Sequence, residues 1–195
     1  MKYTNLQLRI FSHLILVSIF SSLSTSVVYS QTTTWTSGGP WGANINCMSM
    51  VITYPDFIYA GTDLGLFKTV DGGENWTKTD FPDIKARAVA VVSDDPQIVY
   101  VGSDSGLYKS EDGGNTWTMK GLHEASINAI AVEPQNSLTL YVGTGGDTVG
   151  IFKSTDGGDT WQIKYSEGLN AVWVLLIDTE NSSQIYAGVD PDGSG

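Results

Sequence analysis

The chain has 195 residues and a formal net charge of −11, because 21 acidic side chains stand against 10 basic ones. Such an excess of negative charge disfavours nucleic acid and anionic lipid as partners. After residue 30 the sequence holds a single arginine, Arg87, and a single histidine, His123. These counts exclude an imidazole-rich metal site and any site that needs several guanidinium groups, and serine–histidine catalysis would depend on His123 alone.

The N-terminus has the pattern of a secretory signal peptide. Lys2 and Arg9 flank a basic region, the apolar stretch at residues 10–20 is too short to span a membrane, and residues 28–30 suit cleavage. We therefore predict that residues 1–30 are removed and that the mature chain is secreted, periplasmic or at the cell surface, with no membrane span. A retained single-span anchor is the alternative.

The remainder of the chain is a repeat. The tryptophans at 35, 76, 117 and 161 are 41, 41 and 44 residues apart, a period typical of four-stranded propeller blades and of paired-helix repeats. Each unit begins with an apolar or small-residue run, near residues 47–52, 88–92, 128–132 and 172–177. Cys47, the only cysteine, lies in the first of these runs, so no internal disulfide is available and a buried core thiol is expected.

Further short runs follow in every unit. The second run ends in a shared phrase: FIYAG from Phe57, IVYVG from Ile98, LTLYVG from Leu138 and QIYAG from Gln184. A third run, at residues 66–69, 107–110 and 151–154, precedes a glycine-rich turn, and the tryptophan after the turn opens a fourth. Prolines, glycines and aspartates between the runs exclude long helices, so the sequence predicts an all-β fold made of four-stranded antiparallel propeller blades.

The turn before each tryptophan has a physical explanation. In the copy at residues 153–161, KSTDGGDTW, Asp156 can accept hydrogen bonds from backbone amides of the turn, while Gly157 and Gly158 can adopt positive φ. Trp161 then leaves a rigid turn and can bury a large apolar surface over neighbouring strands. We expect it to act as a peg at the outer edge of the blade.

This turn resembles the Asp-box, or bacterial neuraminidase repeat, Ser/Thr-x-Asp-x-Gly-x-Thr-Trp/Phe. The matching residues are Asp71, Gly73 and Trp76 in the first copy, Asp112, Gly114 and Trp117 in the second, and Asp156, Gly158 and Trp161 in the third, with Asn75 departing from the threonine position. The resemblance covers the chain from about residue 35 onward. It implies a structural box between the third and fourth strands of each blade, away from the ligand-binding face.

The sequence ends within its fourth unit. We expect about three full blades and part of a fourth in residues 31–195, a partial Asp-box propeller domain, because the next box would fall near position 198. Asp-box propellers generally close with six or more blades, and closure removes exposed sheet edges. The remaining blades of the same protein are therefore expected partners of this chain.

Several kinds of site are excluded by the residues present. Sialidases share this repeat and resemble one another in clamping the substrate carboxylate with three arginines, which one arginine cannot do. The boxes carry glycines where a calcium loop needs oxygen ligands, and no P-loop or dinucleotide fingerprint occurs. We expect no metal and no cofactor.

The turns between the second and third strands are the candidate binding edge. They place acidic residues around one mouth of the propeller: Asp63, Asp104, Asp147, Asp190 and Asp192, with Trp41 and Trp173 near the same edge. These carboxylates could recognise cations, amines or sugar hydroxyls, and the indoles could stack on sugars. The alternatives are turn-stabilising aspartates and blade-packing tryptophans. The three-residue insertion of the third unit falls in the same turn.

Two functions remain open at this point. The first is an extracellular module that binds or scaffolds glycans or proteins. The second is a glycoside hydrolase, because the segment around Asp63 is similar to that of xyloglucanase-type enzymes, in which a first-blade aspartate is one catalytic carboxylate. Gly61 and residues 66–68 depart from that pattern. Sortilin-type receptor domains and a photosystem assembly factor are further relatives of this repeat, and the second would imply a basic patch that the chain lacks.

Overall fold

The chain divides into two compact units, Met1–Thr36 and Ser37–Gly195. The computed structural model describes residues 39–40 and 43–191 of the second unit. The predicted signal peptide, Trp41 and Asp192 lie outside the described residues.

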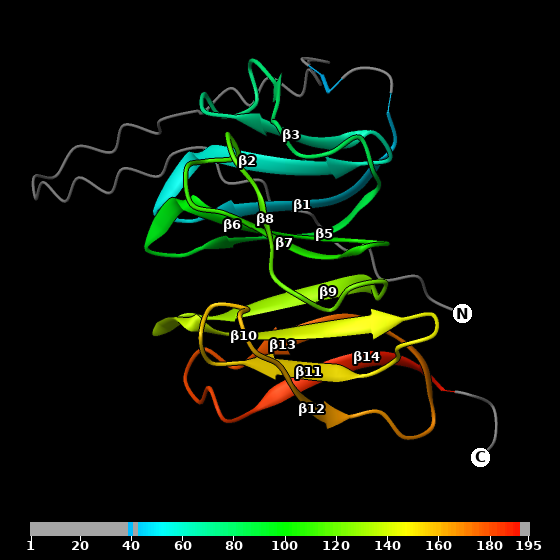
Figure 1. Cartoon of the computed structure of the whole chain (residues 1–195). Coiled ribbons are helices and arrows are strands. Elements are labelled where there is room, and N and C mark those ends of the chain that lie inside the picture. The colour runs from blue at the N-terminus through cyan, green and yellow to red at the C-terminus, as the bar shows by residue number, and fades with distance from the viewer. Residues whose placement is uncertain (1–38, 41–42, 192–195) are drawn as a thin grey trace, which may run out of the picture. The chain divides into compact units, whose positions relative to one another are not determined.

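The described part consists of strands and turns only, and its sheets are antiparallel (Figure 1). The first sheet contains β1 (Ile45–Val51), β2 (Tyr54–Thr62), β3 (Gly65–Thr69) and β4 (Thr77–Lys78). The second contains β5 (Ala86–Val92), β6 (Asp95–Ser103), β7 (Gly106–Ser110) and β8 (Thr118–Met119). The third contains β9 (Ser126–Glu133), β10 (Asn136–Gly145), β11 (Ile151–Ser154) and β12 (Gln162–Tyr165).

A fourth unit begins with the hairpin of β13 (Leu169–Ile177) and β14 (Ile185–Pro191), which joins the third sheet through the Gly145–Ala171 pair. Within each blade the strands pair in chain order from the first to the fourth. The predicted propeller fold, with three four-stranded blades and part of a fourth, is therefore confirmed. Among the residues described, no helix is long and apolar enough to cross a membrane.

The core lies between successive blades. Tyr59 and Tyr100 occupy the same place in the shared phrase of the second strand and are 1% and 0% exposed, respectively. Tyr141 at this position is also buried, whereas Tyr186 in the last hairpin is 57% exposed. The position is therefore buried wherever the described structure places a blade on its far side.

The glycine that ends the shared phrase allows the blades to approach one another. A Cβ atom on Gly102 would lie 2.5 Å from the side chain of Ile127 in the next blade. One on Gly143 would lie 2.5 Å from Val172, in the same relation one blade later. Because real Cβ atoms do not approach so closely, the packing of one blade on the next requires glycine here.

Candidate functional site

The two kinds of turn lie at opposite ends of the blades. In the first blade Thr62 pairs with Gly65 at one end of the β2–β3 hairpin, and Ile58 pairs with Thr69 at the other. Asp63 follows the first pair and Asp71 follows the second. The structure thus separates the candidate binding turns from the Ser/Thr-x-Asp-x-Gly turns, which we call the aspartate turns (residues 69–76, 110–117 and 154–161).

Asp63 is held by side chains from its own blade and from the next one. Asn44 donates from Nδ2 to Oδ2 at 2.9 Å, and Asn46 donates from Nδ2 to Oδ1 at 3.0 Å. Lys85, which immediately precedes β5 of the second blade, places Nζ 3.4 Å from Oδ1. The hydrogen bonds from Asn44 and Asn46, with a smaller contribution from Lys85, lower the pKa of Asp63 below its ordinary value. This carboxylate is therefore ionised at neutral pH.

Asp104 has the equivalent arrangement one blade later. Its Oδ1 pairs with Nε of Arg87 and accepts a hydrogen bond from Ser126 Oγ at 3.4 Å. Arg87 also donates from NH1 to Asn128 Oδ1, at 3.2 Å, in the third blade. We call the set Asn46, Asp63, Lys85, Arg87, Asp104 and Asn128 the polar edge. Its two carboxylates are each paired with a cation, so this part of the mouth is not a ring of unopposed negative charge.

The third and fourth units differ from this pattern. At the position of Asp63 the third unit has Gly145, where a Cβ would lie 2.8 Å from Nδ2 of Asn128. The predicted insertion lies here, since the β10–β11 turn extends from residue 146 to 150 and exposes Asp147. Asp190 in β14 is exposed and pairs through its backbone with Ala171 of β13.

Trp173, in β13, is 53% exposed. A shallow open depression of about 450 Å³ next to Asp63 is lined by Ala43, Asn44, Asp63 and Leu64.

Within residues 39–40 and 43–191, no three His, Cys, Asp or Glu side chains are grouped so that they could hold a metal ion. Cys47 is partly buried, and burial raises the pKa of its thiol to about 11.

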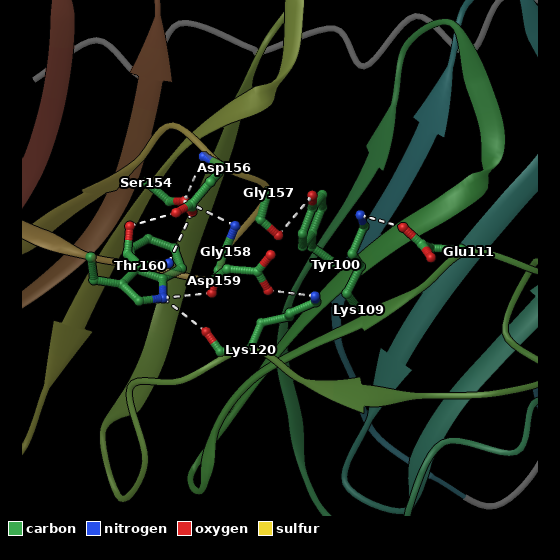
Figure 2. A network of polar contacts seen from close by, with 11 residues as sticks. Tyr100, Lys109, Glu111, Lys120, Ser154, Asp156, Gly157, Gly158, Asp159 and Thr160 are labelled. Carbon is green, nitrogen blue, oxygen red and sulfur yellow. Dashed lines mark hydrogen bonds and ion pairs between the residues drawn. The ribbon is translucent and has the colours of Figure 1, made fainter.

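The aspartate turns have the hydrogen bonds expected from the sequence, as Figure 2 shows for the third copy. Asp156 Oδ1 accepts the Ser154 hydroxyl at 2.7 Å and the Thr160 amide at 2.9 Å, while Oδ2 accepts the Thr160 hydroxyl. The Ser154 Oγ accepts the Gly158 amide at 2.9 Å. Gly157 and Gly158 have φ values of 74° and 97°. The carboxylate and the buried hydroxyl together close the turn.

These hydrogen bonds stabilise the ionised form of each turn aspartate. The Thr69 hydroxyl and the Asn75 backbone and side chain lower the pKa of Asp71 to about 2. The pKa of Asp112 is likewise lowered to about 2, chiefly by the side chain and amide of Thr116. The pKa of Asp156 is lowered further by the same kind of contact with Thr160 and Ser154.

The second aspartate turn docks on the first blade. Lys68 donates from Nζ to Gly113 O at 2.7 Å, and the Asp80 amide donates to Gly114 O at 3.1 Å. The indole of Trp117 packs edge-to-face on Phe81, with ring centroids 5.1 Å apart.

The third turn docks on the second blade in the same way (Figure 2). The Tyr100 hydroxyl donates to Gly157 O at 3.3 Å, and Trp161 donates from Nε1 to Lys120 O at 2.8 Å. Lys120 also pairs with Asp159 at 2.7 Å. The second and third aspartate turns therefore fasten one blade to the next, and Asp112, Asp156 and Asp159 form hydrogen bonds or ion pairs within the protein.

Comparison with known families agrees with this architecture. Residues 56–173 match the model of a family described as the DUF6242 beta propeller domain. The chain belongs to this family. Among curated proteins no sequence matches this DUF6242 chain.

Solved structures show the same fold. An ancestral GH74 enzyme is 24% identical, with a TM-score of 0.67 over 75% of this chain and 22% of its own. The GH74 xyloglucanase from Xanthomonas campestris is 16% identical, with a TM-score of 0.57 over 67% and 25% of the two chains. The extracellular domain of a hybrid two-component system from B. thetaiotaomicron is 19% identical, with a TM-score of 0.56 over 69% and 19%. The DUF6242 chain thus spans about a quarter or less of the length of these structures.

Sequence reasoning missed Asn46, Lys85, Arg87 and Asn128. Each belongs to a first strand or directly precedes one, and only the packing of neighbouring blades brings it to the turn aspartates. The available signal was the recurrence of a long polar residue directly before a small one in the first three units, at Asn46, Arg87 and Asn128.

Proposed function

We propose that this DUF6242 propeller is an extracellular binding module that recognises a neutral glycan at the polar edge. The observation that carries the proposal is the pairing of Asp63 with Lys85 and of Asp104 with Arg87. Paired carboxylates, guanidinium and side-chain amides offer many hydrogen-bonding groups with little net charge. Such a surface suits hydroxyl groups better than it suits a strongly charged ligand.

The proposal includes two further assignments. The three aspartate turns are Asp-boxes of the bacterial neuraminidase type, which leaves the opposite end of the blades for recognition. The mature protein acts outside the cell, in keeping with the pattern of residues 1–30 and with a structural neighbour that is itself an extracellular domain.

A glycoside hydrolase with Asp63 as one catalytic carboxylate is the second candidate. The depression beside Asp63 and its lowered pKa favour this, because a catalytic base must be ionised. Inverting hydrolysis also requires a second carboxyl about 6.5 to 9.5 Å away, with a raised pKa, that acts as the acid. The other carboxylate of the polar edge, Asp104, is engaged in an ion pair with Arg87.

One experiment separates the two candidates. The purified chain is run in affinity gels containing xyloglucan, mixed-linkage β-glucan or polygalacturonate, and the same polymers are assayed for new reducing ends. We expect retardation by a neutral glucan without release of reducing ends. Asp63→Asn should weaken the retardation, while Asp159→Asn, an ion-paired surface aspartate at the opposite end, should not. Release of reducing ends that Asp63→Asn abolishes would instead establish the hydrolase, and no retardation by any neutral polymer would refute the binding proposal.

A further inference from the structure

In the first strand of each described unit, the pairing with the second strand skips a residue at one shared position, and β13 has a second skip nearer its start. In β1, Ile45 pairs with Thr62 and Cys47 with Gly61, so Asn46 is unpaired. The ladders of the other blades skip one residue at the same place: Arg87 in β5, Asn128 in β9 and Trp173 in β13. A bulge of this kind turns a side chain out of the regular alternation of the strand.

The glycine of the shared phrase shows that these four positions are equivalent. The residue after the bulge pairs with Gly61, Gly102, Gly143 or Gly188 in the respective blades. By sequence alone, Asn170-Ala171 would align with Asn128-Ala129. In the structure Val174 pairs with Gly188, which moves the equivalence to Trp173. We call Asn46, Arg87, Asn128 and Trp173 the bulge row.

Members of the bulge row reach from blade to blade. Asn46 donates from Nδ2 to Ala86 O in the second blade at 3.3 Å, and Arg87 donates to Asn128 in the third at 3.2 Å. The side chain of Arg87 remains 28% exposed although blades flank it on both sides. The bulge position therefore faces solvent even where the neighbouring blades are in place.

We propose that the bulge row is the contact line for one extended neutral glycan, with the indole of Trp173 as its stacking platform. This inference rests on the proposed function and adds the residues and the binding mode. The indole presents a large rigid apolar face that can cover a sugar ring. Asn46, Arg87 and Asn128 present amide and guanidinium donors to hydroxyl groups along the same line. Because Asp104 offsets the charge of Arg87, the line favours a neutral polymer over an acidic one.

The test compares Trp173→Ala with Trp173→Phe in the same affinity gels, with xyloglucan and mixed-linkage β-glucan as probes. Truncation of a central aromatic contact should weaken binding by about tenfold or more. Trp173→Phe should retain binding within about threefold, because an aromatic face remains. Tyr165→Ala removes a similarly exposed aromatic from the outer strand β12 and should leave binding unchanged. Thermal unfolding of each variant verifies that it is folded.

The outcomes distinguish the inference from the function on which it rests. If the wild-type chain binds a neutral glucan and folded Trp173→Ala binds it equally well, the bulge row is not the contact line, although the binding module stands. If Tyr165→Ala weakens binding as much as Trp173→Ala, the bulge row is not the contact line, because Tyr165 lies on the outer strand and pairs with Ile151 beside the β10–β11 turn. Preferential binding of polygalacturonate would overturn the neutral-ligand assignment, and no binding of any neutral polymer by the wild type would overturn both proposals.

Discussion

Replacement of Ser110 by alanine tests how the aspartate turns hold the blades. Ser110 is 1% exposed; its hydroxyl donates to Asp112 at 2.8 Å and accepts the Gly114 amide at 2.8 Å. The alanine variant leaves the buried Gly114 amide without its acceptor. A buried donor left in this way costs about 1–3 kcal/mol in the free energy of unfolding. For a domain of this size the melting temperature should fall by about 2 to 12 °C.

The chain provides its own control for this experiment. Thr69 occupies the same position in the first turn, where its hydroxyl donates to Asp71 at 2.6 Å and accepts the Gly73 amide at 3.0 Å. Ser110→Thr should therefore be nearly neutral. Thermal unfolding followed by circular dichroism measures both variants. An unchanged melting temperature in Ser110→Ala, or an equal loss in Ser110→Thr, would refute the role given to the hydroxyl.

Three further predictions concern pH and the blade junctions. The folded pKa of Asp112 is lowered from 3.8 to about 2, so its contribution to stability should be full above about pH 4 and disappear as the pH falls through 2. Asp112→Asn should flatten that part of an acid-unfolding curve. An unaltered curve would contradict the assignment. Tyr100→Ala should lower the free energy of unfolding, measured with denaturant, by about 3–5 kcal/mol. Tyr186→Ala, at the exposed equivalent position, should change it by no more than about 0.5 kcal/mol. Equal losses in the two variants would show that the two positions have the same environment. Gly102→Ala should cost about 1–3 kcal/mol in the same assay, because its methyl group meets Ile127, and a neutral result would contradict the close approach of the blades.

The blades and turns could be predicted from sequence because their causes are local. Asp156 and its two glycines specify the turn by hydrogen bonds within five residues. The regular spacing of the tryptophans gives the length of one blade. The role of Gly102 in blade packing was not predicted, because it depends on the close approach of Ile127 from the next blade.

The polar edge could not be predicted in full for the same physical reason. Arg87 and Asp104 are 17 residues apart and meet only after β5 and β6 have paired. The place of Trp173 depends on the pairing of Val174 with Gly188, which puts the bulge position three residues after Asn170. The similarity of Asn170-Ala171 to Asn128-Ala129 gives no sign of this pairing.

We place recognition at the end of the blades opposite the aspartate turns. The decisive measurement follows the indole N–H resonances of a ¹⁵N-labelled chain during titration with xyloglucan oligosaccharide. We expect the Trp173 resonance to shift while those of Trp117 and Trp161 do not. Shifts confined to Trp117 and Trp161 would place the ligand at the aspartate turns and refute recognition at the polar edge.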